Sequence, residues 1–430
     1  MASSSPAETT VFSFVTKRED RKSIELLQTT ASDSKGNKND EDDIKFKILK
    51  GSLTANNKFY LDFGEKPPFH FFKCYPIVPE QSSLVSSSSK SNDDVVNNEN
   101  YAHPCVWGIA QVTESRLDNV QVGTKYIAML PIGESVSFRT ARVDTEDDYV
   151  LIVDRPTTNP AYNVFRKVDD EDDERYEDLA LACSPGIMTG FGLNFHLRNC
   201  DFYGADAVVV TSASSKVALA LAVYLKHNNN PVTKKIIGYT SESNKEFCRK
   251  TGLYDEIIGY EDALNFEWRT KKTKYVIVDI AGRGEVYNRN IQEPDVEIVK
   301  LLAIGNASGT ANKQSTFASF SMIAKVKLML TMVGAPAMFS SWMNPVQELY
   351  LIFNGMADLK KEWGAEKLRA TLNEYERIFC KAATDEEWIS IRTCDTEESI
   401  QKAFAEIVQG TVHPSETIIL DVVKAVAHRK

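Results

Sequence analysis

The segment Ala207–Leu225, AVVVTSASSKVALALAVYL, decides the fold of this chain. A short apolar run of strand character gives way to small polar residues and then to an apolar-spaced helix. Such a strand–turn–helix is typical of a phosphate site, because small residues let the backbone approach and the first N–H groups of the helix attract an anion. Ser212, Ser214 and Ser215 add hydroxyl donors. From this segment alone, an ordinary strand-to-helix turn without a ligand remains an alternative.

The following segments repeat the pattern of strand and helix. A second strand is predicted at Lys234–Thr240, then a polar turn, a helix over EFCRKTG, and a third strand, DEIIGY, that ends at Tyr260. This order predicts a parallel, doubly wound sheet of the Rossmann type.

The end of the second strand is where such a sheet holds the adenosine ribose. Hydroxyl and ammonium groups there suit a 2′-phosphate better than a 2′-hydroxyl, so the sequence predicts NADPH rather than NADH. The alternative for the lysine at this position, Lys245, is a place on a solvated helix face. The residues at this position are Thr240, Ser241, Asn244 and Lys245 around one acid, Glu242.

Four segments together carry a family resemblance: TSASSKVALALAVYL, GYTSESNKEFCRKTGLYDEIIGYED, YVIVDIAGRGEVYN and LLAIGNASG. They resemble the cofactor domain of the medium-chain dehydrogenase/reductases, in particular the zinc-free quinone reductases. LTANNKFYLDFG, VWGIAQV, NCDFYGADAVVVTSASSK and the Trp363–Gly364 region are similar to an uncharacterised, domain-of-unknown-function branch of that superfamily. The similarity runs from about residue 45 to the C-terminus.

The resemblance implies a set of cofactor contacts. In the quinone reductases a lysine after the second strand and a tyrosine fifteen positions later reach the 2′-phosphate, and Lys245 and Tyr260 have this spacing. A glycine–asparagine–serine segment lies near the nicotinamide in the same enzymes. The implied contacts are Ser212, Ser214, Ser215, Lys216 and Val217 in the turn, Thr240, Ser241, Lys245 and Tyr260 at the ribose, and Gly305 and Asn306 at the nicotinamide.

The turn also departs from the family pattern. Typical members have AxxGGVG, whereas SASSKVA has no glycine between Ser212 and Ala218. Serine side chains then take up volume where a pyrophosphate meets bare backbone, and Lys216 offsets this crowding with a charge. The alternative for Lys216 is an exposed lysine at the start of a helix.

Ligands for zinc are absent at the spacing that a zinc site needs. The seven cysteines occur singly, and WGIAQV stands where zinc-dependent relatives have a GHE motif. The sequence therefore predicts no metal, isolated buried thiols and a reducing compartment.

Composition limits the remaining possibilities. A chain of 430 residues with 43% hydrophobic content can bury two cores. The net charge of −10 disfavours nucleic acid and anionic membranes, and no apolar run reaches the roughly 18–20 residues of a membrane span. A short, arginine-poor N-terminus leaves the cytoplasm as the predicted location.

The predicted domain organisation is discontinuous. Residues 1–180 form a β-rich, GroES-like substrate domain, residues 181–325 a Rossmann NADPH-binding domain, and residues 326–430 complete the first domain. The substrate is then expected in the cleft between the two domains. The polar stretches at 32–43 and 81–100 are predicted to be flexible surface insertions, and the acidic segment Asp169–Asp178 a solvated loop.

The catalytic residues are predicted from LTANNKFYLDFG, which resembles the superfamily segment whose asparagine and tyrosine face the nicotinamide. Tyr60 is then the acid or oxyanion donor, and Asn57 orients the substrate. Alternatively, Tyr60 is a core aromatic in a strand. A further group is predicted to line an apolar acceptor pocket or the contact of a homodimer, or else to belong to the core: Phe317, Phe320, Met338, Phe339 and Trp342.

Three classes of function remain open for this chain. The first is an NADPH-dependent, zinc-free reductase of a small quinone, enone or enoyl thioester. The second is a nucleotide-binding regulator or pseudoenzyme, which the missing glycines favour. The third is a binding protein for RNA or for another protein, and the acidic balance disfavours RNA.

Overall fold

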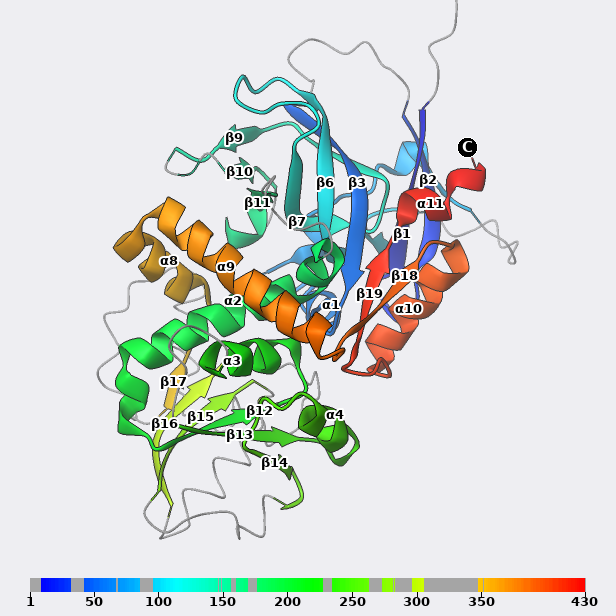
Figure 1. Cartoon of the computed structure of the whole chain (residues 1–430). Helices are drawn as coiled ribbons and strands as arrows, with labels where there is room; N and C mark the ends of the chain where they lie inside the picture. The colour runs from blue at the N-terminus through cyan, green and yellow to red at the C-terminus, as the bar shows by residue number, and fades with distance from the viewer. Residues whose placement is uncertain are drawn as a thin grey trace, which may run out of the picture. The chain divides into compact units, whose positions relative to one another are not determined.

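The computed structural model divides the chain into two compact units (Figure 1). The first comprises Met1–Ala182, Ile391–Val412 and Glu416–Lys430, and the second Cys183–Ser390 and His413–Ser415. The structure describes residues 9–31, 42–66, 69–85, 96–145, 147, 149–155, 160–168, 176–226, 234–262, 273–280, 282, 296–304, 347–350 and 352–429.

The first unit is rich in β-strands. A nine-stranded sheet has the order β18-β19-β3-β6-β7-β11-β10-β9, and β8 pairs with β3. Its strands are β3 (Ile44–Leu53), β6 (Cys105–Ser115), β7 (Lys125–Pro131), β8 (Ser135–Phe138), β9 (Ala141–Val143), β10 (Val150–Val153), β11 (Val164–Lys167), β18 (Ser390–Cys394) and β19 (Glu416–Leu420). A four-stranded sheet has the order β4-β2-β1-β5, from β1 (Thr9–Lys17), β2 (Glu25–Ala31), β4 (Ser82–Leu84) and β5 (Tyr101–Ala102).

The end of the chain returns to this first unit. Strand β19 pairs antiparallel with β3, with Ile418 opposite Leu53. Helix α10 (Glu397–Gln409) begins with a reciprocal capping box between Thr396 and Ser399 and ends at Gly410 in a left-handed conformation. Its buried face packs into the core that also contains β1, β2 and α11 (Val422–Ala425). That face consists of Ile400, Ala403, Phe404 and Ile407, which have helical spacing.

The second unit is built on a six-stranded parallel sheet of order β14-β13-β12-β15-β16-β17. The strands are β12 (Ala207–Thr211), β13 (Lys235–Thr240), β14 (Glu256–Gly259), β15 (Lys274–Asp279), β16 (Glu297–Ala303) and β17 (Gln347–Leu349). Numbered along this unit, the order is 3-2-1-4-5-6, that of dinucleotide-binding sheets. The predicted fold class, a Rossmann-type sheet with a β-rich domain, is confirmed.

Four helices share an aromatic core in the second unit. Phe191 of α2 (Glu177–Asn199) contacts Tyr375 of α9 (Ala365–Asp385) at 5.2 Å between ring centroids. Phe195 of α2 contacts Trp363, the last residue of α8 (Ile352–Trp363), at 4.7 Å. Tyr375 also packs on Tyr224 of α3 (Lys216–Lys226) at 4.8 Å.

This packing differs from the expected domain boundary. The sequence predicts that residues 326–430 complete the first domain, but α8 and α9 belong to the second unit, and only the segments from Ile391 onward, apart from His413–Ser415, return to the first. The reason is the aromatic contact of α8 and α9 with α2 and α3.

Two surface predictions are corrected in part. Within the predicted insertion at 81–100, Ser82–Leu84 pair with β2, and the Asn98 side chain donates to the Ile77 carbonyl and accepts from its N–H, both at 2.7 Å. In the acidic segment, Glu177 and Asp178 begin α2 and form ion pairs with Lys50 at 2.5 and 2.6 Å. Residues 32–41, 86–95 and 169–175 lie outside the described part of the chain.

None of the described helices is both long enough and apolar enough to span a membrane.

His103 gives the first unit a pH-dependent stability. Its Nδ1 lies 3.0 Å from the Tyr75 carbonyl oxygen, and its Nε2 lies 3.1 Å from the Ser13 hydroxyl. Burial lowers the pKa of His103 below its ordinary value of 6.5, although the bond to Tyr75 raises it in part. Between the two pKa values the unfolded chain binds a proton that the folded chain does not, so stability falls as the pH drops below about 6.5.

We therefore expect the melting temperature of His103→Gln to fall less than that of the parent between pH 7.5 and 5.5. His428→Gln, which changes an exposed histidine, serves as the control and should follow the parent. Parallel curves for the parent and His103→Gln would show that His103 does not contribute.

Candidate functional site

The turn between β12 and α3 has a left-handed backbone at its first residue. Ser212 has a φ of 54°, a conformation that glycine adopts freely and other residues only at a cost. The N–H of Ser215 donates to the Ser212 carbonyl at 2.8 Å, and the N–H of Ala213 donates to Tyr239 of β13 at 2.9 Å. The Tyr254 hydroxyl donates to the Ala213 carbonyl at 2.7 Å. Neighbouring elements thus hold the turn in a conformation that serine disfavours.

The serine side chains are used within this turn. The buried Ser214 hydroxyl oxygen accepts from Asn244 Nδ2 at 3.1 Å and from Thr240 Oγ1 at 3.4 Å. The Ser215 hydroxyl accepts from the Ala218 N–H at 3.3 Å and caps α3. These bonds turn the Ser214 oxygen toward β13 and fix the Ser215 oxygen at the helix start.

The start of α3 is packed closely by α2. A Cβ placed on Gly186 of α2 would lie 2.8 Å from the Lys216 Cβ and 3.1 Å from the Val217 nitrogen. Glycine at this position therefore lets the two helices approach. The Lys216 ammonium donates to the Pro414 carbonyl, so the expected charge for a phosphate is directed to the 413–415 segment.

Lys245 is held between two carboxylates. Its ammonium lies 2.6 Å from Asp262 Oδ2 and 3.0 Å from Glu242 Oε2, and its side chain is 12% exposed. The bond to Asp262, and then that to Glu242, raises the pKa of Lys245, and the same bond lowers the pKa of Asp262. Sequence reasoning included Glu242 but missed Asp262. Its position two residues after Tyr260, beyond the third strand, was the signal that could have identified it.

Tyr260, which follows β14, connects the end of that strand to the turn. Its hydroxyl accepts from the Ser212 N–H at 2.8 Å. The structure thus brings two predicted site residues together across β12 and β14, at the carboxyl ends of the strands. Ser241 follows β13 at the same edge, and its hydroxyl lies 3.1 Å from that of Ser243.

A buried pair at the centre of the sheet was also missed. The Thr211 hydroxyl, at the end of β12, donates to Asp279 Oδ1 at the end of β15 at 2.7 Å. It also accepts from the Ile280 N–H at 2.9 Å. Strands β12 and β15 flank the point at which the strand order reverses, where open α/β sheets bind ligands. An aspartate that closes the apolar strand YVIVD was the available signal.

In the first unit, Asn57 and Tyr60 lie on α1 (Asn56–Asp62), so the alternative of a strand for Tyr60 is wrong. Asn57 Oδ1 accepts from the Thr54 N–H at 2.6 Å, and its Nδ2 donates to the Cys105 carbonyl at 2.8 Å. At 3% exposure, Asn57 holds α1 in place with both ends of its amide. Burial, together with these bonds, makes Asn57 better placed to hold α1 than to take the predicted role of orienting a substrate directly.

Tyr60 is 4% exposed and sits among aromatic rings. Its hydroxyl oxygen accepts from Trp107 Nε1 at 2.8 Å. Burial raises the pKa of Tyr60, while the hydrogen bonds from Trp107 and Asn56 lower it in part. A phenol oxygen that accepts hydrogen bonds still carries one O–H group that can donate. The group is suited to donate a hydrogen bond and stays protonated at neutral pH.

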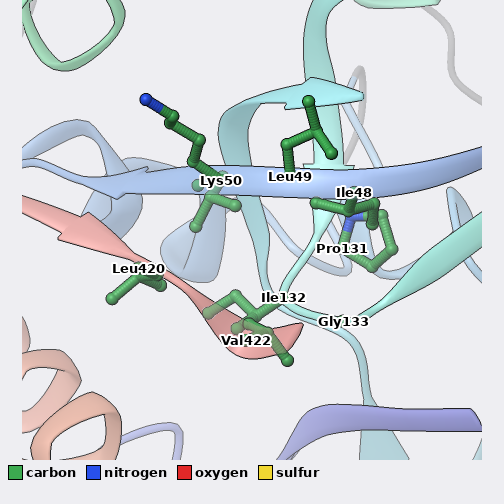
Figure 2. A pocket seen from close by; sticks show the side chains of 10 residues that line it. Ile48, Leu49, Lys50, Pro131, Ile132, Gly133, Leu420 and Val422 are labelled. Atoms are coloured by element: carbon green, nitrogen blue, oxygen red, sulfur yellow. The ribbon is translucent and has the colours of Figure 1, made fainter. Parts of the chain in front are cut away.

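A small recess in the first unit does not resemble a substrate pocket. Figure 2 shows it beside β3, with the Lys50 side chain leading away from Leu420 and Ile132. Its cavity volume of about 10 Å³ is far below the roughly 300–1,000 Å³ typical of ligand pockets. The Lys50 ammonium is held by Glu177 and Asp178.

The thiols do not form a metal site within the described residues, which hold no group of three or more His, Cys, Asp or Glu side chains arranged for an ion. All seven cysteines are free, and six of them are buried. Cys105 is not isolated as expected: a hydrogen bond to Cys74, together with burial, raises the pKa of its thiol.

Several predicted residues fall outside the described part of the chain. They are Gly305, Asn306, Phe317, Phe320, Met338, Phe339 and Trp342.

The parallel sheet and the β-rich unit together have the fold of the medium-chain dehydrogenase/reductases, as the sequence predicted. The chain belongs to the family described as "Protein of unknown function (DUF2855)", whose model matches residues 52–413. No curated protein matches its sequence.

Solved structures are similar to this chain at low sequence identity. E. coli K-12 YhdH with bound NADPH has a TM-score of 0.50 and 10% identity, with 95% of this chain and 99% of that chain covered. CurA from Vibrio vulnificus in complex with NADPH has a TM-score of 0.48 and 12% identity, with 96% and 99% covered. Bacillus subtilis YhfP with NAD bound has a TM-score of 0.48 and 13% identity, with 96% and 100% covered.

The left-handed turn makes a testable prediction for stability. Ser212→Gly should stabilise the chain by about 0.5–1 kcal/mol in urea unfolding, because glycine relieves the backbone cost at this φ. Ser241→Gly is the control and should destabilise, since Ser241 has an ordinary φ of −69°. A loss of stability in Ser212→Gly would show that the Ser212 side chain outweighs the backbone cost.

Proposed function

We propose that this chain is an NADPH-dependent oxidoreductase that reduces a quinone, an enone or an enoyl thioester without a metal ion. The observation that carries the proposal is the end of β12, where a left-handed turn follows a central strand of a 3-2-1-4-5-6 sheet. Ligands bind at this edge of open parallel sheets. The NADPH named with the solved structures of E. coli YhdH and Vibrio vulnificus CurA agrees with this choice.

The residues at this edge fit a dinucleotide phosphate. The backbone of Ser212 adopts the conformation that glycine usually provides, so the turn can approach a phosphate although it lacks glycine. Lys245 supplies a cation, and Ser241 and Tyr260 supply hydroxyls at the ends of β13 and β14. We propose these three residues as the 2′-phosphate contacts, and Gly305 and Asn306 as contacts near the nicotinamide.

The bound cofactor would supply a hydride. The protein must then stabilise the charge that develops on the acceptor oxygen, for which one directed hydrogen-bond donor is worth about 10²–10³ in rate. We propose Tyr60 for this task, because Trp107 and Asn56 donate to its oxygen and its proton is left to donate. Asn57 would act indirectly, by fixing α1 through Thr54 and Cys105.

A nucleotide-binding regulator without turnover is the second candidate. The observation in its favour is that the polar side chains of the turn already have partners: Lys216 is bonded to Pro414, and Ser215 caps α3. NADPH binding without turnover of any acceptor would favour this candidate.

Cofactor preference is tested with Lys245→Ala. Losing one charge-assisted contact costs about 1.5–3 kcal/mol. In a fluorescence titration, NADPH should therefore bind roughly ten- to a hundredfold more weakly, whereas the affinity for NADH should be nearly unchanged. Lys250→Ala, which removes an exposed lysine of the same helix α4 (Lys245–Lys250), should leave both affinities unchanged. Equal weakening of both cofactors by Lys245→Ala would contradict the assignment.

The reaction is tested with a panel of quinones, enones and enoyl thioesters. Tyr60→Phe should lower kcat about 10²–10³-fold and change the NADPH affinity little. The control, Tyr126→Phe, removes the hydroxyl of another buried tyrosine of the first unit and should keep full turnover. If Tyr60→Phe turns over at the parent rate, the donor is another residue.

Metal independence is tested by dialysis against a strong chelator. We expect turnover and melting temperature to be unchanged, because the sequence offers no ligands with zinc spacing. Elemental analysis of freshly purified protein completes the test. Stoichiometric zinc that leaves together with activity would refute the metal-free reaction.

A further inference from the structure

The environment of Lys245 is more acidic than a phosphate site requires. Asp262 and Glu242 both bind its ammonium, at 2.6 and 3.0 Å. The three side chains together carry a net charge of −1. Gly259, the last residue of β14, makes room for them, because a Cβ there would lie 3.0 Å from Glu242 Oε2 and 3.1 Å from Asp262 Oδ2.

A phosphate cannot join this group at no cost. A 2′-phosphate brings up to two negative charges to a lysine that already has two carboxylates within hydrogen-bond distance. Repulsion between like charges a few ångströms apart opposes its binding. A ribose 2′-hydroxyl meets no such repulsion, and carboxylates accept its hydrogen bond.

The two acids differ in how they reach Lys245. Glu242 is three residues away in the chain, and its side chain is 77% exposed. Asp262 comes from the segment after β14 and makes the shorter contact, with its side chain 57% exposed. Exposed ion pairs contribute little to stability, so the Asp262–Lys245 pair is poorly explained as a device that holds the fold together.

We propose that Asp262 occupies the position on Lys245 that the cofactor's 2′-phosphate takes, and that it thereby sets the ratio of NADPH to NADH affinity. This inference rests on the proposed function. Binding of the phosphorylated cofactor exchanges the Asp262 carboxylate for the phosphate on the same ammonium. Asp262 is thus a specificity-determining residue that weakens NADPH without touching the nicotinamide.

The test measures binding by titration calorimetry with NADPH, NADH, adenosine 2′,5′-bisphosphate and AMP. The two adenosine nucleotides differ in the 2′-phosphate and read the ribose site without hydride transfer. Asp262→Asn should increase the affinity for NADPH and for the bisphosphate about five- to tenfold. It should change the affinity for NADH and AMP less than about twofold. The control is Glu261→Gln, which removes one charge from the neighbouring exposed residue and should leave all four affinities within about twofold.

The Lys245→Ala variant tests whether Asp262 acts through Lys245. In the Lys245→Ala variant, the additional substitution Asp262→Asn should no longer favour binding of nucleotides with a 2′-phosphate. The reason is that the Lys245 ammonium, which loss of the Asp262 carboxylate would otherwise free, is absent. Asp262→Ser repeats the test with a different side chain, and the melting temperature of each variant verifies that it is folded.

The outcomes separate the two proposals. If the parent binds NADPH but Asp262→Asn does not change its affinity, the inference on Asp262 is overturned and the proposed function stands. Equal tightening by Glu261→Gln, or an undiminished effect in the Lys245→Ala background, would also overturn it, because general charge would then be the cause. If neither the parent nor Asp262→Asn binds NADPH or the bisphosphate, the proposed function fails, and the inference fails with it.

Discussion

The left-handed backbone of Ser212 is the constraint on which the candidate cofactor site depends. The chain leaves β12 at the centre of the parallel sheet and must turn at once into α3, and a serine makes this turn where a glycine would do so at less cost. The Tyr239 carbonyl, the Tyr254 hydroxyl and the Tyr260 hydroxyl each bond the backbone of Ser212 or Ala213. Strands β13 and β14 and their connection therefore hold the turn, and a change in any of them alters the edge at which a ligand would bind.

The sheet could be predicted from sequence because each of its strands is a short apolar run bounded by polar residues. KKIIGYT, DEIIGY and YVIVD lie on β13, β14 and β15, and their order with the intervening helices fixes a parallel arrangement. The helix that contains Tyr60 was harder to predict, because NNKFYLD places three apolar residues in succession and has neither helical nor strand periodicity. Its helix depends on Asn57, which is tied to Thr54 and Cys105. One of these contacts joins residues far apart in the chain and leaves no local signal.

The domain boundary could not be predicted for a related reason. Helices α8 and α9 have amphipathic patterns, which show that one face is buried but not against which unit. The choice is made by Trp363 and Tyr375, which meet Phe191 and Phe195 of α2. Similarly, Ser214 lies in the turn and Lys216 begins α3, but their partners, Asn244 and Pro414, follow only from the packed structure. Residue types can be read from the sequence, whereas the choice among several available partners requires the fold.

The same distinction applies to cofactor preference. A lysine and a tyrosine fifteen residues apart resemble a 2′-phosphate site, but the field at Lys245 is the sum of all nearby charges, and Asp262 and Glu242 reverse its sign. The residue that attracts the phosphate and the residues that oppose it lie on one edge of the sheet, within a segment of about twenty residues. Selection for either cofactor can therefore act on the acids and leave the lysine unchanged. Under the proposed function, the affinity ratio between the two cofactors at this edge would depend on how readily Lys245 gives up a carboxylate, and the presence of a lysine alone would not determine it.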